Sequence, residues 1–246
     1  MEKPIVFKNK NGKQLMGILH VPGGQKKFPL VVFCHGFGGT KTKRKYVRLA
    51  RALEKKGIAS FRFDFEGCGD SEGSPRDLTA EKEVSDLNFA LKAVLNACNV
   101  DSKRIAFIGG SLGGVITSSF VERFKISAKA LVLLAPAFNQ KELFRIWYTK
   151  EDLKEIEGKG FLIKGEKEIG RDYYLENRNK DYSPVLSKIN LPILLIHGKK
   201  DEDVPLKFSE ELAEKYENIT LKVLPDANHK FDDLTTQEKL VKLTVN

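Results

Sequence analysis

The stretch that decides the fold is Ile105–Phe124, which reads IAFIGGSLGGVITSSFVERF. Its first part, Ile105–Gly109, has the length and apolar character of a buried strand, whereas Leu112–Phe124 has helical periodicity. The residues between them, Gly109-Gly110-Ser111-Leu112-Gly113, fit the pattern G-x-S-x-G. A serine at such a sharp turn from strand to helix has a strained backbone, and its hydroxyl projects clear of the sheet. We therefore expect Ser111 to be a nucleophile; a glycine-rich turn without chemistry is the alternative.

Short apolar runs alternate with amphipathic stretches along most of the chain. Several runs are continuously apolar, as expected for strands of a parallel sheet that is covered on both faces. The predicted strands are Leu30–Cys34, Ala59–Phe65, Ile105–Gly109, Ala130–Ala135, Ile193–Ile196 and Thr220–Leu224. The predicted helices are Arg44–Lys56, Thr79–Asn96, Leu112–Phe124, Leu206–Tyr216 and Thr235–Val245. This order predicts an α/β fold with a mostly parallel, twisted sheet flanked by helices.

The N-terminal residues follow a different pattern. Ile5–Phe7 and Leu15–Val21 flank Asn11-Gly12, which is a tight-turn signal. They predict an antiparallel hairpin at the edge of the sheet.

A serine hydroxyl needs a base to become a good nucleophile, and the chain contains 4 histidines. His35, His197 and His229 all follow predicted strands, at the edge of the sheet where ligands bind in open parallel sheets. In this architecture the chain order is Ser, then Asp or Glu, then His, which leaves His197 and His229. His197 abuts a strand and is expected to be packed there, whereas His229 lies in a loop that can reach Ser111.

The acid that orients the base is expected in the loop after Ile193–Ile196, where Asp201, Glu202 and Asp203 compete. We favour Asp201, because Glu202 and Asp203 are suited to turn or capping roles before the helix predicted from Leu206. The acid would fix the tautomer of the histidine and stabilise the imidazolium.

A glycine-rich loop, His35-Gly36-Phe37-Gly38-Gly39, follows the strand Leu30–Cys34. Such a loop can turn backbone N–H groups toward a developing negative charge. We expect an oxyanion hole formed by the N–H of Phe37 and the N–H of Leu112, the residue after the nucleophile. A simple glycine turn is the alternative.

One segment, residues 138–188, interrupts the alternation of strands and helices. We predict that it is a cap inserted between two parts of the core, residues 1–137 and 189–246, because a long insertion without a role is uncommon. A solvated helical decoration is the alternative, and an aromatic-rich cap could also form a homodimer. The aromatic residues interleaved in this charged segment are Phe144, Trp147, Tyr148, Phe161, Tyr173, Tyr174 and Tyr182.

Composition excludes several classes of protein. With 41% hydrophobic and 30% charged residues, the chain is expected to fold as a globule, and no apolar run is long enough for a membrane span. The N-terminal sequence lacks the apolar core of a signal peptide, so a cytoplasmic location is expected. The formal net charge is +9, but basic residues are dispersed among acidic ones and no nucleic-acid motif is present. The 3 cysteines have neither disulfide-framework nor metal-site spacing.

These motifs together resemble the α/β-hydrolase superfamily, and within it the small bacterial and archaeal esterases that include cinnamoyl (feruloyl) esterases. The matching stretches are HGFGG at 35–39, FRFDFEGCGDSEG at 61–73, GGSLGG at 109–114, LLAPA at 133–137, IHGKKDEDVP at 196–205 and DANHKF at 226–231. The resemblance implies that Ser111, Asp201 and His229 form a catalytic triad and that Phe37 and Leu112 form the oxyanion hole.

The resemblance also has departures. Relatives commonly have histidine where this chain has Gly110, and often have histidine where it has Cys68; neither position carries the chemistry. Only 170–174 of the predicted cap looks loosely like cinnamoyl esterases, which makes Tyr174 a candidate for contacting an aryl hydroxyl, with packing inside the cap as the alternative.

The implied activity is that of a serine carboxylesterase, which cleaves short-chain or aryl (cinnamoyl-type) esters through an acyl-enzyme without a metal or organic cofactor. Its partner would be a small-molecule ester. One alternative is a serine aminopeptidase of the same fold. A non-enzymatic binding protein is the other, but it would not need a complete triad.

Overall fold

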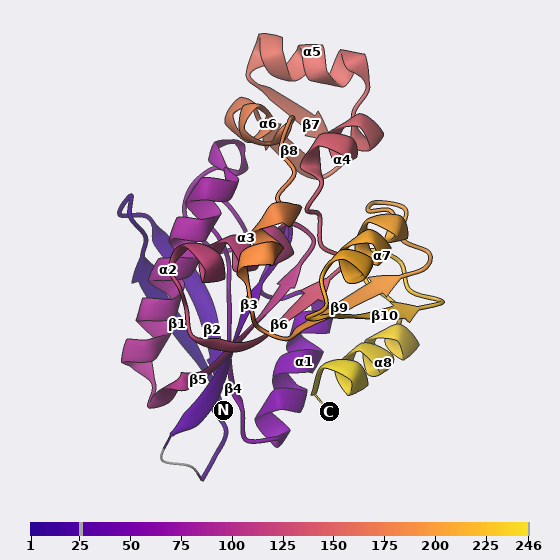
Figure 1. Ribbon diagram of the computed structural model, residues 1–246. Coiled ribbons are helices and arrows are strands. Elements are labelled where there is room, and N and C mark those ends of the chain that lie inside the picture. Colours follow the sequence, from indigo (N-terminus) through magenta and orange to yellow (C-terminus); the bar gives the residue numbers. More distant parts are fainter. Residues whose placement is uncertain (25–26, 246) are drawn as a thin grey trace.

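A twisted sheet forms the centre of the computed structural model, which describes residues 1–24 and 27–245 (Figure 1). The sheet has eight strands in the order β1-β2-β4-β3-β5-β6-β9-β10. Strand β2 pairs antiparallel with β1 and β4, and all other neighbours are parallel. The strands are β1 (Glu2–Lys8), β2 (Gln14–His20), β3 (Phe28–Cys34), β4 (Ala59–Phe63), β5 (Val100–Gly110), β6 (Ala128–Leu134), β9 (Ile193–Gly198) and β10 (Ile219–Leu224). The predicted α/β fold and edge hairpin are confirmed.

Helices cover both faces of this sheet. Strand β3 shows why, since Leu30, Val32 and Cys34 pack in one cluster with apolar residues of α2 and α3. Val31 and Phe33, which alternate with them, pack on the other face with residues of α1 and α8. The core helices are α1 (Arg44–Lys55), α2 (Ala80–Ala97), α3 (Leu112–Arg123), α7 (Leu206–Lys215) and α8 (Leu234–Val245), with a 3₁₀ turn, η1 (Pro75–Asp77), before α2. A strand with two buried faces must be continuously apolar, and this is why the apolar runs of the sequence predict these strands.

The segment 138–188 folds into several short elements, and all of them except the last turn lie beside one end of the sheet, at the top of Figure 1. Its elements are α4 (Gln140–Trp147), α5 (Lys150–Lys159), β7 (Phe161–Lys164), β8 (Lys167–Gly170), α6 (Arg171–Asn177) and the 3₁₀ turn η2 (Ser183–Lys188). Helix α5 begins with a capping box between Thr149 and Asp152 and ends at Gly160, which has a left-handed backbone. The hairpin β7–β8 was not predicted, because its strands are short and its turn is charged.

Among residues 1–24 and 27–245, no helix combines the length and the apolar character needed to cross a membrane.

Candidate active site

Ser111 lies at the turn between β5 and α3 in a conformation that few non-glycine residues adopt, with φ 54° and ψ −122°. Backbone hydrogen bonds hold it there. Its N–H donates to the carbonyl of Leu134 at 2.9 Å, and its own carbonyl accepts from the N–H groups of Gly114 at 3.0 Å and Ala137 at 3.2 Å. A strained backbone persists only where its surroundings determine it, which is typical of a nucleophile at a strand-to-helix turn.

Two glycines allow the backbones around Ser111 to approach closely. A Cβ on Gly113 would lie 2.3 Å from the carbonyl oxygen of Cys34, at the end of β3. A Cβ on Gly36 would lie 2.9 Å from the Cβ of Ser111 itself. The loop after β3 is therefore in van der Waals contact with the serine, as an oxyanion loop must be.

His229 and Asp201 form a direct pair. The Nδ1–H of His229 donates to Oδ2 of Asp201 at 2.8 Å, and the side chain of Asp201 is fully buried. The Nε2 atom of His229 is thereby left as the acceptor of the ring, which is the form a general base requires.

The second histidine near the acid, His197, also contacts Asp201. Its Nε2 lies 3.1 Å from Oδ2 of Asp201 and 2.9 Å from the carbonyl of Val204. Both of those atoms are acceptors, so Nε2 of His197 carries a proton. In the neutral ring, Nδ1 then accepts the hydroxyl of Ser209 at 2.7 Å. His197 is packed at the end of β9, as expected, yet it donates to the proposed acid, which sequence reasoning did not predict.

The remaining oxygen of Asp201 is also satisfied. Oδ1 accepts the backbone N–H groups of Asp203 at 2.9 Å and Val204 at 2.8 Å. Burial alone would raise the pKa of Asp201, but the hydrogen bonds from His197 and His229 outweigh it and hold that pKa well below its usual value. Asp201 is therefore ionised and fixed in orientation.

His35 positions the loop after β3. Its Nε2 accepts the backbone N–H of Phe65 at 3.2 Å, so the proton lies on Nδ1, which donates to the carbonyl of Gly36 at 2.9 Å. Burial lowers the pKa of His35 and keeps the ring neutral. Among the described residues the N–H of Phe37 has no acceptor, and Leu112, as the first residue of α3, has no intrahelical acceptor for its N–H. Both N–H groups are thus available to an oxyanion.

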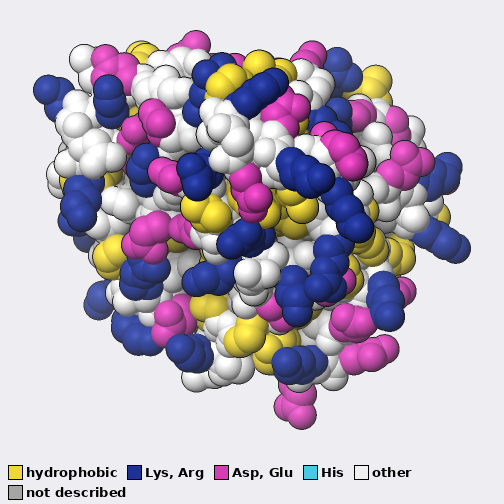
Figure 2. All heavy atoms as spheres, turned by 90° about the horizontal axis from the view of Figure 1, so that it is seen from above, with side chains coloured by type: hydrophobic (Ala, Val, Ile, Leu, Met, Phe, Trp, Pro, Cys, Tyr) yellow, Lys and Arg dark blue, Asp and Glu magenta, His cyan; other side chains and the backbone are white. Residues whose placement is uncertain are grey.

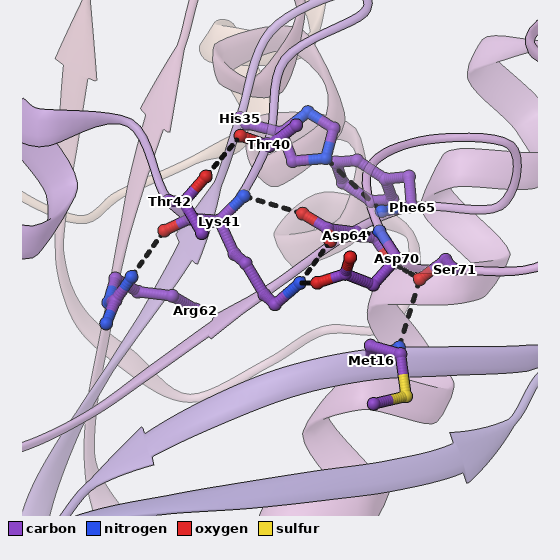
Figure 3. A network of polar contacts seen from close by, with 10 residues as sticks. All are labelled: Met16, His35, Thr40, Lys41, Thr42, Arg62, Asp64, Phe65, Asp70 and Ser71. Carbon is purple, nitrogen blue, oxygen red and sulfur yellow. Dashed lines mark hydrogen bonds and ion pairs between the residues drawn. The ribbon is translucent and has the colours of Figure 1, made fainter.

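A buried network ties the same loop to the one after β4 (Figure 3). Asp64 is fully buried; it accepts the backbone N–H of Lys41 at 2.6 Å and the N–H of Asp70 at 3.0 Å, and it pairs with the Lys41 ammonium. Arg62 donates to the carbonyl of Lys41. The stretch FRFDFEGCGDSEG, which the sequence marks only by resemblance, thus anchors the loop in which the oxyanion hole is predicted.

A cavity of about 730 Å³ brings three of the predicted site residues together. Ser111, His229 and Phe37 line it, and the segment 138–188 supplies several aromatic side chains to its wall. Within the described part of the chain, no hydrogen bond joins the Ser111 hydroxyl to His229. Such bonds are often long before substrate binds.

The structure does not bring Tyr174 into this cavity. Its hydroxyl donates to Glu157 at 3.2 Å and accepts from Arg178 at 3.2 Å, and its ring lines a separate cavity of about 220 Å³. The preceding residue, Tyr173, lines the cavity of Ser111 instead, with its ring centroid 4.8 Å from that of Phe37. Successive residues on a helix point about 100° apart, so only one of the two tyrosines can face the cavity.

Comparison with known proteins places the chain in a family. Residues 25–158, more than half of the chain, match the family described as "Serine aminopeptidase, S33". The chain therefore belongs to this family of α/β-hydrolases, and the resemblance seen in the sequence is confirmed.

Similar proteins include esterases. The chain is 29% identical to Esterase EstD of Thermotoga maritima over 87% of this chain, and it spans 57% of the length of EstD. It is 26% identical to the protein YfhR of Escherichia coli, over 92% of this chain and 72% of YfhR. The structure of Est1E from Butyrivibrio proteoclasticus with bound ferulic acid superimposes with a TM-score of 0.86 at 24% identity, over 98% of this chain and 96% of Est1E. This last likeness shows the shared fold.

Proposed function

We propose that the protein is a serine carboxylesterase that cleaves short-chain or aryl esters through an acyl-enzyme. The observation that carries this proposal is the His229–Asp201 pair, which opens into the same cavity as the strained Ser111. The names of the similar proteins EstD and Est1E support an ester as the substrate.

In the proposed reaction, Oγ of Ser111 attacks the acyl carbon and its proton passes to Nε2 of His229. The imidazolium keeps its Nδ1–H on Asp201, which stabilises the positive charge. The N–H groups of Phe37 and Leu112 would donate to the oxyanion. The leaving alcohol then takes the proton from His229, and an acyl-enzyme remains.

Water completes the cycle by the same route. His229 takes a proton from the water as it attacks the acyl carbon, and returns that proton to Oγ of Ser111 when the acid departs. Apart from the ester and water, every group in this scheme is a residue of the chain.

We also propose that residues 138–188 act as a cap, with 1–137 and 189–246 as the core. The support is that Trp147, Tyr148 and Tyr173 line the cavity that contains Ser111. Aromatic walls of this kind would select the acyl or alcohol group.

The test is the kcat/KM of the Ser111→Ala variant on p-nitrophenyl acyl esters from acetate upward, with methyl ferulate alongside. We expect turnover to fall to background while the melting temperature is retained. Ser118→Ala is the matched control, because Ser118 lies on the same helix α3 and its hydroxyl bonds to the carbonyl of Gly114. Full activity of Ser111→Ala would overturn the proposal.

The family's description favours one second candidate, an aminopeptidase that uses the same residues. Hydrolysis of an amino-acid anilide, compared with the ester of the same amino acid, separates the two. A kcat/KM for the anilide above that for the ester would replace the esterase proposal with the peptidase.

A further inference from the structure

The wall of the active-site cavity carries more positive than negative side chains. Of its cations, Lys164 is already paired with Asp152. For the others, no carboxylate lies within ion-pair distance in the described residues. The cations of the wall are Lys43, Arg44, Lys45, Lys164, Lys167 and Lys230, and its carboxylates are Glu166, Asp203 and Asp232. Seen from above in Figure 2, Lys and Arg side chains also run side by side across this end of the molecule, with acidic side chains scattered among them.

Lys45, in the first turn of α1, is the cation whose position is best defined. It is half-buried, and its Nζ lies 5.1 Å from the ring centroid of Phe231 and 5.4 Å from that of Tyr46. Phe231 is fully buried and follows His229 by two residues. The ammonium group is therefore held over two aromatic rings, beside the loop that carries the proposed base.

Holding an ammonium group there has an energetic cost. Burial lowers the pKa of Lys45 to about 8, and the carboxylates of Asp232 and Asp201 only partly offset this effect. A partly desolvated cation without a bonded partner gains more from an anion than a hydrated surface lysine does. The other lysines of the cavity wall would add to the same positive potential and attract anions.

We propose that the natural substrate is an ester that carries a carboxylate, and that Lys45 binds this carboxylate. This inference rests on the proposed esterase function and narrows its substrate class. The carboxylate lies either on the acyl group, as in a half-ester of a dicarboxylic acid, or on the alcohol, as in an ester of a hydroxy acid.

The experiment compares kcat/KM for matched pairs of esters. For the acyl side, the pair is mono-p-nitrophenyl adipate and p-nitrophenyl hexanoate, which have the same chain length. For the alcohol side, it is 4-acetoxybenzoate and 4-acetoxybenzamide. We expect the anionic ester of at least one pair to be preferred about tenfold or more, with the preference falling as NaCl is raised.

Variants then assign the preference to Lys45. In Lys45→Met the ratio of the anionic to the neutral kcat/KM should fall about tenfold, and Lys45→Arg should restore most of it. The ratio is taken within each variant, so a general loss of activity cancels. Lys207→Met is the control, because Lys207 is exposed on α7 and pairs with Glu211.

The possible results are distinguishable. If neither ester of either pair is hydrolysed, the esterase proposal fails and this inference fails with it. If neutral esters are hydrolysed but no anionic ester is preferred, only the inference on charge is overturned. A preference that survives in Lys45→Met also overturns the role of Lys45.

Discussion

The proposed catalytic residues are positioned by neighbours that would not touch the substrate. His197 and His35 each have one ring nitrogen whose role is fixed by a backbone group, Val204 in one case and Phe65 in the other. Each ring is thereby held in one tautomer; His197 orients Asp201, the proposed acid, and His35 orients the loop in which the oxyanion hole is proposed. The sequence places both histidines correctly at strand ends, but their partners come from distant parts of the chain and leave no local signal.

At the residue scale, Gly36→Ala tests how closely the oxyanion loop must approach the serine. The added methyl group would lie 2.9 Å from the Cβ of Ser111 and 3.0 Å from the carbonyl of Gly110, so the loop or the serine must shift. We expect kcat/KM to fall about tenfold or more, since small displacements of reacting groups are costly. Gly23→Ala is the control, because a Cβ there would meet none of the described residues within 4 Å. Equal activity of the two variants would contradict the close approach.

A second prediction at this scale concerns Asp201 and pH. Because its pKa in the folded protein lies below the unfolded value of about 3.9, its contribution to stability is present above about pH 4 and is lost as the pH falls toward the folded pKa. We expect Asp201→Asn to lower the free energy of unfolding by about 1–3 kcal/mol at pH 7. The difference from the wild-type protein should narrow below pH 4.

Thermal unfolding at pH 7 and pH 3.5 measures this difference. Asp226→Asn is the control, because Asp226 is exposed and pairs with two lysines at 3.5 Å and 3.7 Å. If Asp201→Asn is less stable than the wild-type protein by the same amount at both pH values, then Asp201 is not held as a buried anion.

At the scale of elements, the sequence predicts those helices and strands correctly that belong to the buried centre of the sheet. The central strands and their helices are predicted to within a few residues, except for the exposed N-terminal part of β5, because a strand with two buried faces must be apolar throughout. Prediction works less well in 138–188, where β7–β8 is partly exposed and charged, and where the choice between Tyr173 and Tyr174 depends on the rotation of α6. The network around Asp64 was also not predicted, because it joins loops that only the fold brings together.

The network around Asp64 leads to a prediction about how the loops after β3 and β4 are held together. In Asp64→Ala, the ammonium and N–H groups of Lys41 lose a buried partner, and breaking a buried ion pair costs about 3–5 kcal/mol. The loop after β3 would also loosen, so activity should fall together with stability. Asp70→Ala is the matched control, since Asp70 pairs with the same ammonium but its side chain is 70% exposed. Both the free energy of unfolding, measured with denaturant, and kcat/KM should be much lower in Asp64→Ala than in Asp70→Ala. Equal values in the two variants would mean that the buried pair does not anchor the loop.

For the whole molecule, the question is how the segment 138–188 is coupled to the core. One link is Trp147 at the end of α4, whose indole N–H donates to the carbonyl of Asp203 at 2.7 Å, in the loop that also holds Asp201. Its ring packs on the cluster of Leu143 and Val204, and it also lines the active-site cavity. A single side chain thus joins the proposed cap, the loop of Asp201 and the cavity of Ser111.

Trp147→Phe keeps an aromatic ring but removes this hydrogen bond, at a cost to stability of about 1 kcal/mol. If the segment acts as a cap, KM should rise more for p-nitrophenyl octanoate than for the acetate, because only the longer acyl chain reaches the cap wall. Tyr216→Phe is the control; it removes a comparable bond from the hydroxyl to the carbonyl of Ser183, and Tyr216 does not line the cavity. If KM rises by the same factor for both esters in Trp147→Phe, then the segment supports the fold without selecting the substrate.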